Sequence, residues 1–205
     1  MRIRQGFESL DLQPYFDNDA ISTAANPGDG AFNVWGNSFA AEHLPASGAH
    51  VVVDGVPFVF PPKEDGLRNN LRCAGQVIPV PPAHVDWVWL LVASERRAED
   101  AVALHFDDGM VDFEPLRVSD FWAAPALFGE TAAFVCPVMH YPHHVQKGVA
   151  ATLWCQRVPA IRRAPLVRLR LPRNLAVHVF AVTLALAPCC AAADRPATMG
   201  RPRCA

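Results

Sequence analysis

Two short segments of the sequence carry side chains that could bind a metal ion or act on a substrate. The first is FDND, in which Asp17 and Asp19 are hard oxygen donors one residue apart on an extended chain. Such carboxylates suit Ca²⁺, which takes six to eight oxygen ligands, and Asp29 or Glu42 could add further donors. The alternative is that both carboxylates accept backbone N–H groups and shape a turn before Ile21. We favour the turn and keep a structural calcium ion as the second interpretation.

The second segment is MHYPHH, which places His140, His143 and His144 close together in the sequence. Zinc binds imidazole nitrogens in tetrahedral geometry, and His105 from a neighbouring strand could complete such a site. However, Pro142 forces a turn, and no carboxylate can be assigned as an acid–base partner. A solvated loop therefore explains the histidines better than a metal site does. The sequence also lacks a nucleophile elbow and a phosphate-binding loop.

Composition limits the partners and the compartment. The 205 residues are 51% hydrophobic and 19% charged with a formal net charge of −2, which argues against nucleic-acid binding. No apolar run reaches the ~18 residues that span a membrane, and no secretory pattern opens the chain, so we expect a cytoplasmic protein. The six cysteines have no regular spacing, which favours reduced thiols, with a Cys136–Cys155 bridge as the alternative.

The elements that would position these residues are short strands. The segment 49–62 reads as a hairpin through Asp54-Gly55, and 101–118 as a second hairpin. The segment 85–94 is apolar on both faces, as a central strand would be. Together with the 19 spread prolines, this pattern predicts an all-β, jelly-roll-like antiparallel β-sandwich over residues 1–187, with a disordered tail at 188–205. We also expect a short helical turn at 95–101.

The order of several motifs is similar to that of a known family. The segments YFDNDAIS, GNSFAAEHLP, GVPFVFPP, GLRNNLRCAGQVIPVP, VSDFW and LRLPRNLAVHVFAVTLA follow one another between Asp11 and Ala185. In this order they resemble actinobacterial β-sandwich domains of the galactose-binding-like, carbohydrate-binding-module type, which occur attached to glycoside hydrolases and as stand-alone proteins. The resemblance implies a galactose-binding-domain-like sandwich and a role related to sugars. The chain differs from the family pattern at AFNVWGN, where a glycine-rich segment is expected.

Saccharide binding would need exposed aromatic faces and hydrogen-bonding groups on loops. Trp35 in NVWGNSF and Trp122 after SDF are candidates for exposed platforms. Trp87 and Trp89 lie in an apolar strand and are expected in the core, and Trp154 is expected either in the core or on an oligomer face. We therefore predict a non-catalytic carbohydrate-binding or accessory domain whose ligand is a saccharide or glycosylated small molecule. The expected contact residues are Trp35, Asn37, Glu42, Asn69, Asn70 and Trp122.

Two other classes of function remain open. The chain could be a small metal-dependent enzyme of a secondary-metabolite pathway that uses the histidine segment or Asp17 and Asp19. It could also be a structural or homo-oligomeric protein whose exposed strand face meets a partner.

Overall fold

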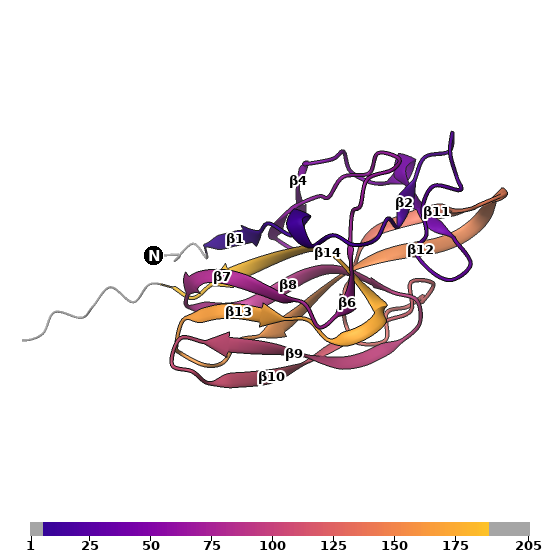
Figure 1. Ribbon diagram of the computed structural model, residues 1–205. Helices are drawn as coiled ribbons and strands as arrows, with labels where there is room; N and C mark the ends of the chain where they lie inside the picture. The colour runs from indigo at the N-terminus through magenta and orange to yellow at the C-terminus, as the bar shows by residue number, and fades with distance from the viewer. Residues whose placement is uncertain (1–5, 189–205) are drawn as a thin grey trace, which may run out of the picture.

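Two β-sheets and a β-hairpin stack as layers in the computed structural model, which describes residues 6–188 (Figure 1). The larger sheet has the order β1-β14-β8-β12-β11-β3-β2, and β6 also pairs with β14. Its strands are β1 (Phe7–Leu10), β2 (Ile21–Ser22), β3 (Ser38–Ala40), β6 (Leu71–Ala74), β8 (Val85–Ser94), β11 (Thr131–Tyr141), β12 (His144–Pro159) and β14 (Arg173–Leu186).

The smaller elements lie on either side of this sheet. A four-stranded sheet has the order β10-β9-β13-β7, and β4 pairs with β5 as a separate hairpin. The bounds are β4 (His50–Val53), β5 (Val56–Val59), β7 (Val77–Ala83), β9 (Ala98–Phe106), β10 (Val111–Val118) and β13 (Leu166–Arg170). Two three-residue 3-10 turns, η1 (Gln13–Tyr15) and η2 (Ala41–His43), complete the described elements. The all-β sandwich predicted from the sequence is therefore confirmed, and within the described residues only β2 and β3 pair in parallel.

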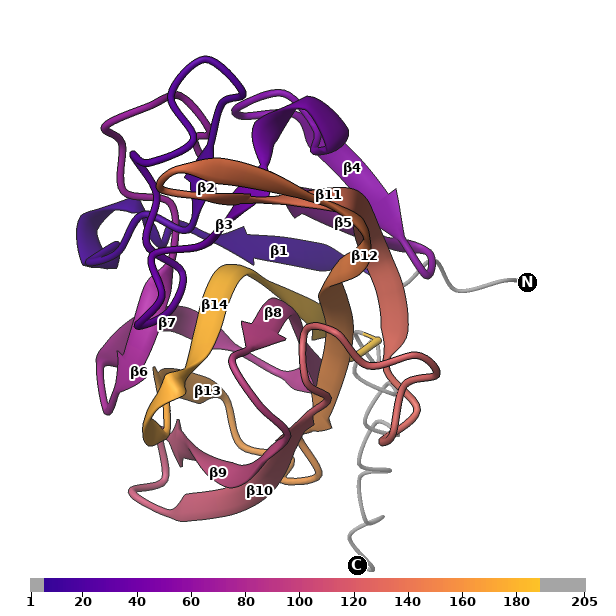
Figure 2. The same ribbon diagram turned by 90° about the vertical axis from the view of Figure 1, so that its right-hand side faces the viewer.

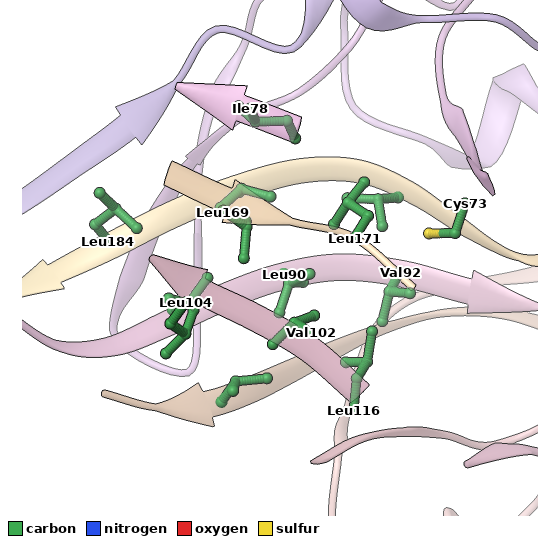
Figure 3. Close-up of a cluster of buried hydrophobic side chains, with 14 of the residues drawn as sticks. Cys73, Ile78, Leu90, Val92, Val102, Leu104, Leu116, Leu169, Leu171 and Leu184 are labelled. Atoms are coloured by element: carbon green, nitrogen blue, oxygen red, sulfur yellow. The ribbon is translucent and has the colours of Figure 1, made fainter. Parts of the chain in front are cut away.

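The central strand β8 explains why one segment is apolar on both faces. Successive side chains of a strand point to opposite sides of the sheet. Leu90 and Val92 face the four-stranded sheet, where they pack with Leu104 and Leu169 in the first core (Figure 3). Leu91 faces the opposite side and belongs to a second core. The prediction that 85–94 forms a central strand is correct, since β8 lies between β14 and β12.

The second core lies between the larger sheet and the β4–β5 hairpin. It contains fully buried phenylalanines from separate parts of the chain, among them Phe32, Phe39, Phe58 and Phe180. Figure 2 shows the hairpin and the four-stranded sheet on opposite sides of β8 and β14. Fully burying one such side chain contributes roughly 1.5–3 kcal/mol, so this core can hold the loops above it in fixed positions.

Both predicted hairpins are present. Asp54 and Gly55 have φ values of 52° and 78°, the left-handed pair of a type I′ turn, which matches the twist of the two strands. In the β9–β10 turn, Asp108 accepts the N–H of Met110 at 3.0 Å and Gly109 has a φ of 82°. Turn chemistry in the sequence therefore predicted both connections correctly.

Two predictions of local structure are wrong. The expected helical turn at 95–101 does not form, because Ala98 already begins β9 and pairs with Val118 of β10. The Cys136–Cys155 bridge does not form either, since Ala151 lies opposite Cys136 and Thr131 opposite Cys155. Both cysteines are free and buried, and burial raises the pKa of each thiol to about 12.

Two other expectations concern the C-terminal tail and membrane-spanning segments. The predicted tail lies outside the described residues, apart from Pro188. Within residues 6–188, no helix has the length and apolar character needed to cross a membrane.

Candidate functional site

A pocket of about 330 Å³ lies where the loop before β3 meets the ends of β8, β10 and β11. Trp35, Trp122 and Tyr141 line it, together with several polar side chains, and we call it the aromatic pocket. The side chain of Trp35 is 71% exposed and that of Trp122 is 38% exposed. Both predicted aromatic platforms, Trp35 and Trp122, therefore line one pocket.

The Trp35 loop is a tight turn held by hydrogen bonds between its own residues. The side chain of Asn33 accepts the N–H of Trp35 at 3.1 Å, and the carbonyl of Asn33 accepts the N–H of Gly36 at 2.9 Å. Gly36 has a φ of 66°, a conformation that costs glycine little. Phe32 then donates its N–H to the carbonyl of Asn37 at 2.6 Å, which closes the loop. The segment AFNVWGN, where the chain differs from the resembled family, thus forms one wall of the pocket.

The Trp122 loop is fixed between two strands of the larger sheet. The N–H of Phe121 donates to the carbonyl of Ser94 at 2.9 Å, and the carbonyl of Phe121 accepts the N–H of Thr152 at 2.8 Å. One residue earlier, the Asp120 carboxylate accepts the N–H of Trp122 at 2.8 Å. These contacts fix the backbone at Asp120 and Trp122, which both line the pocket.

A buried phenylalanine joins the two loops behind the pocket. The rings of Phe32 and Phe121 pack edge to face with centroids 5.0 Å apart, and Phe39 contacts both. Such pairs contribute roughly 0.5–1.5 kcal/mol beyond the area they bury. Each exposed tryptophan is therefore carried on a loop whose neighbouring phenylalanine is anchored in the second core.

The polar lining of the pocket includes an acceptor without a partner. The side chain of Asn37 is only 2% exposed, and its Oδ1 makes no hydrogen bond with any of residues 6–188. Buried polar atoms are nearly always hydrogen-bonded, and an unsatisfied one costs about 1–3 kcal/mol. Asp120 lies in the same lining, and burial raises the pKa of its carboxyl group.

A second carboxylate of the pocket, Glu95, is linked to the protein interior. Its Oε1 lies 3.4 Å from Nη2 of Arg72 and 3.4 Å from Nε2 of His178. The His178 ring is fully buried and its Nδ1 lies 2.9 Å from Oδ1 of Asn70. Burial lowers the pKa of His178, so the imidazole is neutral near pH 7 and Arg72 is the cation that balances Glu95.

The predicted contact residues Asn69 and Asn70 lie outside the pocket lining and are fully buried. Oδ1 of Asn69 accepts the N–H of Ala20 at 2.9 Å, and Nδ2 of Asn70 donates to the carbonyl of Asn18 at 3.1 Å. The two amides therefore connect the segment after β1 to the start of β6. Nδ2 of Asn69 also donates to the Asp19 carboxylate, and the carbonyl of Asn70 accepts the N–H of Asp17 at 3.1 Å. We call the whole group the amide cluster: Asp17, Asn18, Asp19, Asn69 and Asn70.

The FDND carboxylates are held by N–H donors. Asp17 accepts the N–H of Arg72 at 2.9 Å, and Asp19 accepts the N–H of Ile21 at 3.1 Å in an Asx turn. Among residues 6–188 no group of three or more His, Cys, Asp and Glu side chains is placed to hold a metal ion. Calcium binding by Asp17 and Asp19 stays a prediction, which thermal unfolding in CaCl₂ and in EDTA tests.

The remaining predicted contact residue, Glu42, lies beside the histidine segment. Its Oε1 accepts the N–H of Ala24 at 2.7 Å, and its Oε2 lies 3.9 Å from Nε2 of His140. His140 is buried, and its Nδ1 lies 3.0 Å from Oγ of Ser22. A serine, a histidine and a carboxylate thus occur together, but Ser22 has no exposed surface, so a substrate could not reach its hydroxyl. His144 instead stacks on Tyr141 at 4.7 Å.

The structure brings Trp35, Asn37 and Trp122 together, whereas Glu42, Asn69 and Asn70 lie elsewhere. Sequence reasoning did not assign five other lining residues to the site: Asn33, Glu95, Asp120, Phe121 and Tyr141. Glu95 had one available signal, since it is the first charged residue after a strand that is apolar on both faces.

The fold defines a class, the β-sandwich domains, and in this chain the loops at one edge of the sheets form the aromatic pocket. Within that class, the chain belongs to the AziU2-like beta-sandwich domain family, whose model matches residues 6–187. No curated protein matches the chain. The family match supports the sandwich, and the likeness to galactose-binding domains and carbohydrate-binding modules stays a prediction.

Proposed function

We propose that the protein is a non-catalytic saccharide-binding domain and that the aromatic pocket is its binding site. Sugar rings present apolar C–H faces that pack on aromatic rings, and hydroxyl groups around their edge that need acceptors and donors. Trp35, Trp122 and Tyr141 offer the rings, and Glu95 and Asp120 offer acceptors beside them. This combination matches the usual composition of small-molecule sites, which are mostly apolar with a few placed polar groups.

The single observation that carries the proposal is the convergence of Trp35, Trp122 and Tyr141 on one pocket beside the Asp120 carboxylate. The rings can stack on the apolar face of a sugar, and the carboxylate can accept from its hydroxyl groups. Because the loops are already anchored by Phe32 and Phe121, little ordering of the protein would accompany binding.

A glycan array followed by calorimetry with the best ligand tests the proposal. We expect Trp35→Ala and Trp122→Ala each to weaken binding by about tenfold or more, because each removes one stacking surface. Phe113→Ala is the matched control, since Phe113 is also an exposed aromatic residue (64%) but lies on β10 outside the pocket. An equal loss of affinity in the Phe113 variant would contradict the assignment of the site.

Two further measurements, of bound metal and of oligomeric state, would support the alternatives. Stoichiometric metal that is lost on substitution of His140 would favour the enzyme. A stable dimer that shows no thermal shift with any saccharide would favour the oligomer-forming protein.

A further inference from the structure

The charges around the aromatic pocket are not balanced. Its lining contains the carboxylates of Glu95 and Asp120 and no basic side chain. Glu95 is compensated from behind by Arg72, whose Nη2 lies 3.4 Å from it. Neutral His178, the other neighbour of Glu95, adds no positive charge.

Asp120 is the carboxylate without a counter-ion. The Asp120 side chain forms no salt bridge within residues 6–188. Its carboxylate accepts one hydrogen bond from the described chain, the 2.8 Å bond from the N–H of Trp122. Its partial burial raises the pKa of the carboxyl group, because the charged form has lost part of its hydration. A cation placed at the pocket would restore that lost stabilisation.

The aromatic lining favours a cation as well. The face of a tryptophan or tyrosine ring is negative, and an ammonium group within about 6 Å of the ring centre is attracted to it. Trp122 follows Asp120 by two residues on the same anchored loop, and Trp35 and Tyr141 line the same pocket. A carboxylate and aromatic faces at one pocket suit a protonated amine on an otherwise uncharged ligand.

A neutral sugar could donate hydroxyl groups to acceptors in the lining, but it would leave the Asp120 charge without a counter-charge.

We propose that the ligand of the aromatic pocket carries a free, protonated amine, and that Asp120 is its counter-charge. With the saccharide class taken from the function proposed above, on which this step rests, the ligand is an amino sugar or amino-bearing glycoside. The amine contacts Asp120 and an aromatic face, and the sugar ring packs on the second tryptophan.

Calorimetry with glucosamine oligosaccharides and their N-acetylated counterparts of equal length tests the proposal at mildly acidic pH, where the amines are protonated, and at low salt. The two ligands share one scaffold, but the free amine is charged, whereas the acetamide is neutral and carries an additional acetyl group. We expect the free amines to bind about tenfold more tightly. Added salt should reduce this preference, because Asp120 is only partly buried and screening acts on such charges.

Asp120→Asn isolates the charge. Asparagine can still accept the N–H of Trp122, so the loop should keep its conformation. The variant should bind both ligands within about threefold of each other, whereas Asp11→Asn should keep the preference of the unaltered protein. Asp11 is a matched control because it also caps the N–H two residues ahead, at 3.0 Å, and lies outside the aromatic pocket.

Each result distinguishes this inference from the proposed function. Equal binding of the amine and acetamide ligands would overturn the inference and leave saccharide binding intact. Binding of tetramethylammonium, lost in Asp120→Asn, without binding of any saccharide would support the cation site and overturn the saccharide function. Binding of neither probe would overturn both.

Discussion

The aromatic pocket and the amide cluster contain the same kinds of side chain in different states. In the amide cluster, Asn69 and Asn70 are fully buried and make hydrogen bonds with backbone and side-chain partners. In the aromatic pocket, Asn37 is as deeply buried, yet its Oδ1 has no partner in residues 6–188. The difference teaches that residue type does not identify a binding group, because the pairing and the exposure of each side chain are set by the folded chain.

Substitution in the amide cluster should have the largest effect on stability. Asn69→Ala removes the acceptor of the Ala20 N–H and the donor to the carbonyl of Leu67, and leaves buried groups unpaired. We expect the free energy of unfolding to fall by about 2–4 kcal/mol in urea denaturation. Asn26→Ala is the control at an exposed asparagine and should change it by less than about 0.5 kcal/mol. A loss as small as that of the control would show that the cluster is not structural.

The same residue type in the pocket should respond with the opposite sign. Asn37→Leu keeps a similar branched shape, although leucine is larger, and removes the unpaired Oδ1, so the free energy of unfolding should stay unchanged or rise by about 1 kcal/mol. Ligand affinity should change less than in Trp35→Ala, because the removed oxygen is buried behind the pocket surface. Calorimetry and urea denaturation on one preparation measure both quantities. A loss of stability as large as that of Asn69→Ala would mean that Asn37 has a structural partner after all.

The fold could be predicted from the sequence because its signals are local. Asp54-Gly55 specifies its turn, and the segment 85–94 carries two apolar faces that only a central strand can bury. The failures arose where distant pairing decides the outcome. The segment 95–101 has no strong strand pattern, and it begins β9 because β10 pairs with it. The register of β11 against β12, which separates Cys136 from Cys155, also has no signature in the sequence.

The candidate site could be predicted only in part. Trp35 and Trp122 were found because aromatic residues in polar loops are unusual, and the structure places both in one pocket. Asn69 and Asn70 were selected as amides on a loop, but their burial depends on contacts with Asn18 and His178, which are distant in sequence. Whether an amide is already paired is a property of the folded chain.

The smallest expected effect concerns Asp19, the carboxylate of the amide cluster that burial affects most clearly. Burial raises the pKa of Asp19 from 3.8 to about 6, against the hydrogen bonds from Ile21 and Asn69. The folded protein therefore binds this proton more tightly than the unfolded chain does. The contribution of Asp19 to the free energy of unfolding is present at low pH and is lost as the pH rises through about 6.

Asp19→Asn should remove this pH dependence and keep both hydrogen bonds, since the amide oxygen can accept them. The difference in unfolding free energy between Asp19→Asn and the unaltered protein should therefore grow in favour of the variant from below pH 4 to above pH 6, by urea denaturation at each pH. The effect is modest because Asp19 is only about half buried and solvent screens its charge. If the Asp19 variant instead loses stability above pH 6, the charge itself is required, and a bound cation at the amide cluster becomes the better explanation.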